Sequence, residues 1–226
     1  MPRKKFQQQL TELREDTLYM SELVAERVRM GLRALETEDE ALAREVIERD
    51  HEINELYLEL ERDCIDLFAL QQPVAGDLRF IAASFKIITD LERVGDLATN
   101  LGDYTLAAER DLYPHVDVQG IGDEVLEMLD DAVSAYADES VADCTAIDER
   151  DDEIDAMCER ASETVVRDLI ETEIDDGTAS ADVESLMDGV SRLLLTIRDL
   201  ERVGDHAVNI AARTLYMVEN NDELIY

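Results

Sequence analysis

The sequence predicts an all-α fold made of two tandem, pseudo-symmetric three-helix bundles. The composition favours long helices, because 226 residues contain only 9 glycines, 3 prolines and no tryptophan. The chain also repeats itself. Segment 90–100 (DLERVGDLATN) returns as segment 199–209 (DLERVGDHAVN), with nine of eleven positions identical. Together these observations indicate two similar helical units.

A second, shorter repeat precedes the first one in each half. ERDHEIN at 48–54 returns as ERDDEID at 149–155, an offset of 101 residues, whereas the longer motif is offset by 109. We therefore expect a first repeat over residues 1–112 and a second over residues 118–226. A functional site assigned to one half should therefore be looked for at the equivalent residues of the other half.

Apolar residues spaced three and four apart predict three helices in the first half, over about residues 6–35, 39–70 and 75–110. The polar turn ETED ends the first helix. The second stops before Pro73, because a residue that precedes proline avoids helical geometry. The third helix contains the longer repeated motif.

The same pattern returns after a linker over residues 111–120, which contains Pro114 and Gly120. Three further helices are predicted over about residues 121–138, 140–173 and 180–218. Asp175, Asp176 and Gly177 separate the last two. The connections are short, so sequential helices should pack antiparallel.

The charge of the chain excludes several functions. Its 56 acidic and 21 basic residues give a net charge of −35. Direct nucleic-acid binding needs a cationic face, and anionic membrane surfaces repel such a protein. Self-repulsion of this size favours a protein from a very salty cytoplasm, whose stability should rise with KCl concentration.

The hydropathy of the chain and its cysteines both favour a cytoplasmic protein. No apolar run is long enough to span a membrane and the N-terminus lacks the apolar core of a signal peptide, so we expect a cytoplasmic protein without membrane insertion. Cys64, Cys144 and Cys158 show no zinc-ligand spacing. We expect them to be small hydrophobic residues of helices in a reducing compartment.

The repeated carboxylates fall on two kinds of helix face. Glu92, Asp96 and Asn100 share a stripe that points away from the apolar residues of their helix, which by itself would fit a solvated acidic surface. Asp50 and Asn54 instead interrupt an apolar face, and Asp151 and Asp155 do so in the second half. A carboxylate there costs several kcal/mol unless a cation or a donor meets it.

Two kinds of cation could meet these carboxylates. Arg93 and Arg202 could reach Asp50 and Asp151 as structural salt bridges. Alternatively, Asp50 and Asn54 could face Glu92 and Asp96 across neighbouring helices and hold a metal ion. Such an oxygen-only set suits Mg²⁺, Mn²⁺, Ca²⁺ or ferric iron better than zinc.

Other chemistry has little support in the sequence. A di-iron bundle needs two Glu-x-x-His pairs, and Glu48 with His51 is not repeated, because its copy ends in Asp152. His206 replaces Leu97 of the first copy, which favours a helix-face filler over a ligand. Phosphate-binding glycine loops and nucleophile elbows are absent, so we expect no enzyme and no catalytic residue.

The segment QQPVAGDLR at 71–79, followed by the motif at 90–100 and its repeat at 199–209, resembles the PhoU family of phosphate-uptake regulators. The resemblance covers essentially the whole chain. It implies two pseudo-symmetric three-helix bundles that form a homodimer, with metal clusters of iron or zinc on the bundle surfaces.

The resemblance also assigns the candidate metal ligands. In the first bundle they are Asp50, Asn54, Glu92 and Asp96, with Asn100 as a further candidate. In the second they are Asp151, Asp155, Glu201 and Asp205, with Asn209 as a further candidate. Asn54 departs from the acidic pattern, so the first site should be weaker or hold fewer ions.

The function implied by the resemblance is regulatory. Members of the family restrain the phosphate ABC transporter when phosphate is plentiful and, in bacteria, quiet a phosphate-sensing histidine kinase. The expected partners are the ATPase subunit of the transporter and a sensor kinase. The acidic composition suggests a halophilic archaeon, where the transporter contact should matter more.

Two other functions compete with this one. An acidic storage protein would bind many metal ions weakly and have no dedicated partner. A metal-dependent enzyme would lose turnover on replacement of Glu201, but the sequence offers no acid or base centre for it.

Overall fold

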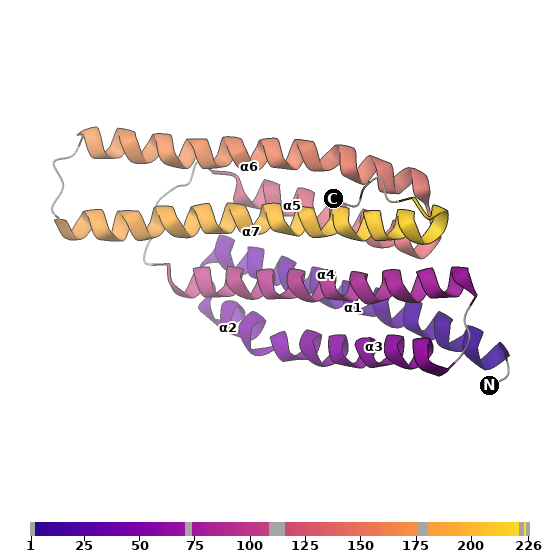
Figure 1. Cartoon of the computed structure of the whole chain (residues 1–226). Coiled ribbons are helices and arrows are strands. Elements are labelled where there is room, and N and C mark those ends of the chain that lie inside the picture. The colour runs from indigo at the N-terminus through magenta and orange to yellow at the C-terminus, as the bar shows by residue number, and fades with distance from the viewer. Residues whose placement is uncertain (1–2, 71–73, 109–115, 176–179, 222–223, 225–226) are drawn as a thin grey trace.

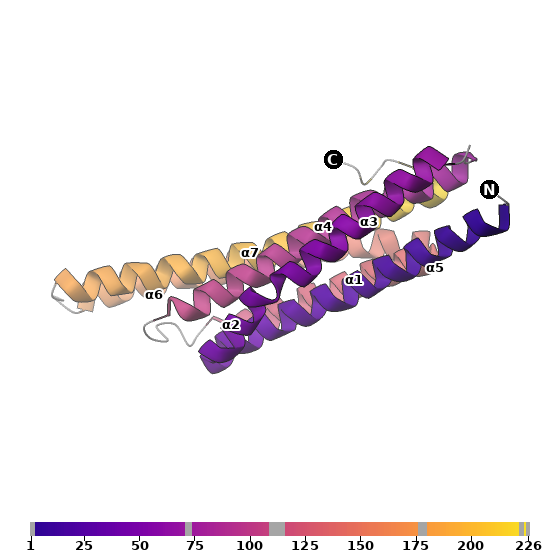
Figure 2. The ribbon, with the colours of Figure 1, turned by 90° about the horizontal axis from the view of Figure 1, so that it is seen from below.

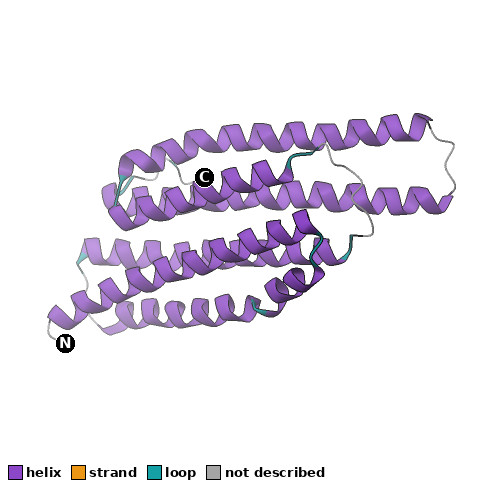
Figure 3. Cartoon of the chain, turned by 180° about the vertical axis from the view of Figure 1, so that it is seen from behind, coloured by secondary structure: helices purple, strands orange, loops and turns teal. Residues whose placement is uncertain are grey.

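A computed structural model describes residues 3–70, 74–108, 116–175, 180–221 and 224. Within these residues the chain forms helices only, as Figures 1 and 3 show, and the predicted all-α class is confirmed. The helices are α1 (Arg3–Thr37), α2 (Glu40–Glu48), α3 (Asp50–Leu70), α4 (Ala75–Leu106), α5 (Val118–Asp138), α6 (Val141–Asp175) and α7 (Ser180–Glu219).

All six predicted helices are present, but the second is divided at Arg49. The backbone of Arg49 (φ −92°, ψ 5°) leaves helical geometry, and its side chain binds Glu45 of α2 and Glu52 of α3. No glycine or proline marks this position, and the apolar pattern continues through the break. The sequence alone therefore could not show it.

Helix ends differ from the prediction by a few residues. α5 begins at Val118, inside the predicted linker, because the Asp117 carboxylate accepts a hydrogen bond from the Gly120 backbone N–H at 2.8 Å. α4 ends at Leu106, earlier than the predicted residue 110. Residues 109–115 of the predicted linker lie outside the described residues.

The helices form two layers. Antiparallel hairpins α3–α4 and α6–α7 lie side by side through contacts between α4 and α7, which gives a layer in the order α3, α4, α7, α6 (Figure 1). Helices α1 and α5 contact each other and cover one face of this layer, as the turned view in Figure 2 shows. Among the described helices, none packs on the opposite face.

The core runs through both halves. Buried apolar side chains of α1 and of α3 to α7 join into one cluster, which includes Val28, Leu91, Leu129 and Leu200. The division into repeats 1–112 and 118–226 thus remains a sequence prediction, because the two halves share this core. No described helix is long and apolar enough to cross a membrane.

The three cysteines behave as predicted. Cys64, Cys144 and Cys158 are free and buried. Burial raises the pKa of the Cys64 thiol to about 12 and that of Cys144 to about 11. Such thiols stay protonated at neutral pH and act as small hydrophobic side chains.

Candidate functional site: two carboxylate clusters on the helical hairpins

Each hairpin brings its two repeated motifs together through a close helix contact. A Cβ at Gly95 of α4 would lie 3.1 Å from Cδ1 of Ile53 in α3, and a Cβ at Gly204 of α7 would lie 3.4 Å from Oδ1 of Asp151 in α6. Gly95 therefore lets α4 approach α3 closely, whereas at Gly204 a Cβ would meet only ordinary van der Waals contacts. This contact places the acidic residue pairs of neighbouring helices beside each other.

The second cluster contains Asp151 and Asp155 of α6 with Glu201 and Asp205 of α7. Burial raises the pKa of Asp151 to about 7, and the neighbouring charges of Asp155 and Asp205 add to the effect. Burial, followed by the neighbouring carboxylates, also raises the pKa values of Asp155 and Glu201. These shifts show that the four predicted residues share one region of negative potential.

Asp151 occupies the most demanding position in this cluster. Its Oδ1 atom is buried and has no hydrogen-bond partner. A buried carboxylate oxygen without a donor is costly in free energy. A cation at this position would satisfy the oxygen and offset the repulsion among the carboxylates.

The first cluster is better satisfied by the protein itself. Asp50 accepts hydrogen bonds from Asn54 Nδ2 at 2.7 Å and from Thr99 Oγ1 at 3.2 Å. Burial raises the pKa values of Glu92 and Asp96, and the charge of Asp50 contributes to both shifts. The replacement of an aspartate by Asn54 thus supplies a donor where the second cluster has another negative charge.

The salt-bridge alternative is wrong for both arginines. Arg93 and Arg202 form no ion pair with Asp50 or Asp151, although all four residues are described. The Arg202 guanidinium instead lies 3.8 Å from Oδ1 of Asp199. Spacing along one helix could not decide which neighbouring carboxylate an arginine reaches.

The clusters do not form a closed metal cage. Among the described residues, no group of three or more His, Cys, Asp or Glu side chains is arranged to hold a metal ion as it stands. Asp155 and Asp205 are exposed and Glu201 is half-buried, so rotation of these side chains would be needed to enclose an ion. The all-oxygen chemistry and the unpaired Asp151 fit a hard cation.

The two candidate asparagines lie in different surroundings from the carboxylates. Asn100 donates from Nδ2 to Oδ2 of the fully buried Asp199 at 2.9 Å, and Tyr104 donates to the same oxygen at 2.8 Å. Asn100 therefore contributes to the contact between α4 and α7. Asn209, its counterpart, is half-buried on α7.

The sequence interpretation assigned no role to Asp90 and Asp199, which begin the repeated motif. Both are buried between α4 and α7, and Asp90 lies 2.9 Å from Nδ1 of His206. His206 thus fills a buried position, as predicted, but it also pairs with an acid from the other half. The signal was present, because an aspartate repeats on the apolar side of both motif helices.

The single Glu-x-x-His pair does not form a buried centre. Glu48 and His51 are both exposed, and Nδ1 of His51 lies 2.8 Å from the backbone oxygen of Glu48. The pair thus lies at the protein surface, and the absence of a di-iron site stays a prediction.

Comparison with known proteins gives a consistent result. The sequence model of the PhoU domain matches residues 17–105 and again residues 118–214. The chain is 33% identical over 220 residues to a phosphate-specific transport system accessory protein PhoU homolog from Pseudomonas putida, covering 96% of this chain and 82% of the relative. It is also 33% identical to PhoU homolog 1 from Methanothermobacter thermautotrophicus, over 96% of this chain and 95% of the relative.

Solved structures agree with the sequence comparison. The crystal structure of PhoU from Pseudomonas aeruginosa superposes with a TM-score of 0.83 at 29% identity, over 96% of this chain and 100% of that one. The phosphate transport system regulatory protein PhoU from Streptococcus pneumoniae also gives a TM-score of 0.83, at 26% identity, over 96% of this chain and 98% of that one.

Proposed function

Because the chain belongs to the PhoU domain family, we propose that it is a negative regulator of phosphate uptake that acts as a cytoplasmic adaptor on the phosphate ABC transporter. The observation that carries this proposal is the double match of the PhoU domain, which covers both halves of the chain. Relatives of similar length are named accessory proteins of the phosphate-specific transport system. These relatives by themselves support a regulator of phosphate transport.

The direct partner in this proposal is the ATPase subunit of the transporter. A sensor histidine kinase, in cells that have one, is the second partner, and a homodimer is the working state. The fold supports such a role, because one face of the four-helix layer carries no further described helix. The surface of an adaptor must remain open to its partner.

The proposal includes metal binding at the second cluster. Asp151, Asp155, Glu201 and Asp205 would hold the ion, and its charge would link α6 to α7 by offsetting their mutual repulsion. The hydrogen bonds of Asp50 to Asn54 and Thr99 support a weaker site in the first bundle. Iron, zinc, magnesium and manganese are the candidate ions.

A pull-down experiment tests the adaptor role. The tagged chain, at high KCl and with phosphate present or absent, should retain the transporter ATPase of the same organism. Failure to retain the ATPase under any phosphate condition would count against the proposal. An acidic storage protein without a dedicated partner would then be the better account.

A further inference from the structure

Exposed apolar side chains gather at the tips of both hairpins. Among the described residues, every exposed large apolar side chain except Tyr19 lies on the α3–α4 or the α6–α7 hairpin. We call Ile65, Phe68 and Leu78 the first tip patch, and Val166, Ile170 and Met187 the second tip patch. The first lies where α3 ends and α4 begins, and the second where α6 ends and α7 begins (Figure 1).

The two patches are copies of one arrangement. Ile65 and Val166 are 52% and 45% exposed and are separated by the same 101 residues as the shorter motif. Leu78 and Met187 are 40% and 47% exposed and are separated by the same 109 residues as the longer motif. Single exposed apolar residues are ordinary, but a pair that is exposed in both copies of a duplication indicates an interaction surface.

Each patch continues the line of a carboxylate cluster. On α7, Met187, Leu194, Glu201 and Asp205 follow one another at spacings of seven, seven and four residues, and α4 repeats this spacing in Leu78, Phe85, Glu92 and Asp96. Residues at such spacings share one helix face. Each hairpin thus presents a surface that is acidic in the middle and apolar towards its tip.

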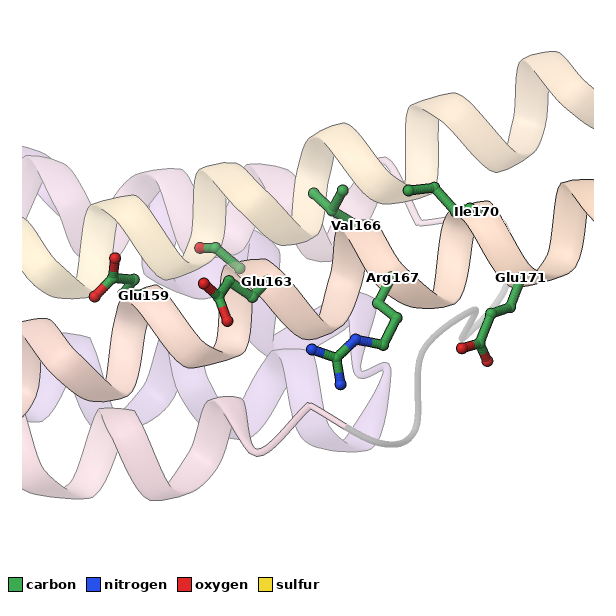
Figure 4. A pocket seen from close by; sticks show the side chains of 7 residues that line it. Glu159, Glu163, Val166, Arg167, Ile170 and Glu171 are labelled. Atoms are coloured by element: carbon green, nitrogen blue, oxygen red, sulfur yellow. The ribbon is translucent and has the colours of Figure 1, made fainter.

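The second tip patch borders an open pocket of about 630 Å³ along α6. In Figure 4, Val166 and Ile170 project from one side of the helix, and Arg167 and Glu171 project from the other. Glu159 and Glu163 also line the pocket. Three glutamates and one arginine line this pocket, so the border of the apolar strip is net acidic and fits a helix that has apolar residues on one face and basic residues beside them.

We propose that the two tip patches, with the acidic residues beside them, are docking surfaces for a basic amphipathic helix of a partner protein. A second copy of this chain is a poorer occupant of these patches, because the acidic residues beside them would face the same acidic residues of the copy; a homodimer would use another surface. An anionic membrane is disfavoured for the same reason. The inference rests on the proposed function only in taking the partner to be a component of the phosphate transport system.

The test uses three double variants of the full chain: Ile65→Glu/Leu78→Glu, Val166→Glu/Met187→Glu, and a control with Tyr19→Glu and Leu58→Gln. Tyr19 is 54% exposed and lies outside both patches, and Leu58 is exposed on α3 away from the hairpin tip. The probe is a helical peptide of about 18 residues with leucine on one face and lysine on the other. Circular dichroism melts confirm that each variant is folded.

The added glutamates distinguish apolar docking of the peptide from electrostatic attraction between the peptide and the acidic chain. Purely electrostatic binding of the lysine peptide would strengthen in every variant, because each becomes more acidic. We expect the two patch variants to weaken peptide binding at least about tenfold and the control to retain it. Patch variants that bind the peptide as well as the unmodified chain, or better, would overturn the inference.

Binding of the purified transporter ATPase to the same variants separates the two proposals. Loss of binding in the patch variants supports both. An ATPase that binds every variant equally well overturns the patches as its docking surface while leaving the proposed function intact. An ATPase that fails to bind the unmodified chain counts against the proposed function, and the peptide result then decides the inference by itself.

Discussion

The Nδ1 atom of His206 in α7 lies 2.9 Å from Oδ1 of Asp90 in α4, and both side chains are buried between the two halves of the chain. Asp199, the copy of Asp90, makes the corresponding contact in the other direction, with Asn100 and Tyr104 of α4. The two halves are therefore joined by buried polar contacts as well as by apolar packing. These contacts fix how α4 and α7 align.

Replacement of His206 by leucine, the residue at the equivalent position 97, should destabilise the fold by about 1–3 kcal/mol, because Asp90 would remain buried without its partner. Urea unfolding at fixed KCl concentration measures the change. The double variant Asp90→Leu/His206→Leu should recover part of the loss, since no polar group is then left unpaired. A His206→Leu variant as stable as the unmodified protein would contradict the importance of this pair.

The stability of the metal-free protein should fall as pH rises from about 4 to 7. Asp151 has a pKa of about 7 in the folded state against 3.8 as a free side chain, so the folded state binds more protons over this interval. The effect should be roughly 1–2 kcal/mol, well below the full value of the shift, because the side chain is only half-buried and solvent screens its charge. Urea unfolding at pH 5 and pH 8 with a chelator measures it.

The Asp151→Asn variant supplies the comparison for this pH effect. It should be more stable than the unmodified protein at pH 8 and show a smaller pH dependence. Glu153→Gln, which removes an exposed acid of the same helix that does not contribute to the raised pKa of Asp151, should leave the dependence unchanged. Equal pH dependence in the Asp151→Asn variant and the unmodified protein would show that another group is responsible.

The two motif glycines should respond differently to alanine. Gly95→Ala places a Cβ 3.1 Å from Ile53 and should cost about 1 kcal/mol or more through crowding. Gly204→Ala meets only ordinary contacts at 3.4 Å and should be neutral or stabilising by up to about 1 kcal/mol, because alanine favours helix. Thermal melts compare them, and a Gly95→Ala variant more stable than Gly204→Ala would contradict the described packing.

Metal content should depend on both clusters but more on the second. Purified at high salt, the Glu201→Ala/Asp205→Ala variant should lose a larger share of bound metal than Glu92→Ala/Asp96→Ala, because only the second cluster contains an unpaired buried oxygen. Elemental mass spectrometry measures the ratio of metal to protein. Glu149→Ala/Glu153→Ala, two exposed acids of α6, is the matched control. Equal metal content in all four proteins would exclude the predicted ligands.

Much of this architecture could be read from local sequence patterns. Apolar spacing located the helices, and the repeated segments located Asp151 and Glu201 on neighbouring helices, because an antiparallel hairpin brings such segments together. The break at Arg49 escaped prediction, since no proline or glycine marks it. The polar contacts between the two halves could not be predicted either, because apolar periodicity does not show that His206 contacts Asp90 or that Asn100 contacts Asp199.

Phosphate uptake in cells that lack this chain tests the central claim most directly. In phosphate-replete medium, the deletion strain should take up labelled phosphate faster than its parent, and expression of the unmodified chain should restore the low rate. A deletion that leaves the rate of uptake unchanged, with the transporter present and active, would contradict the role of this protein as a negative regulator of phosphate transport.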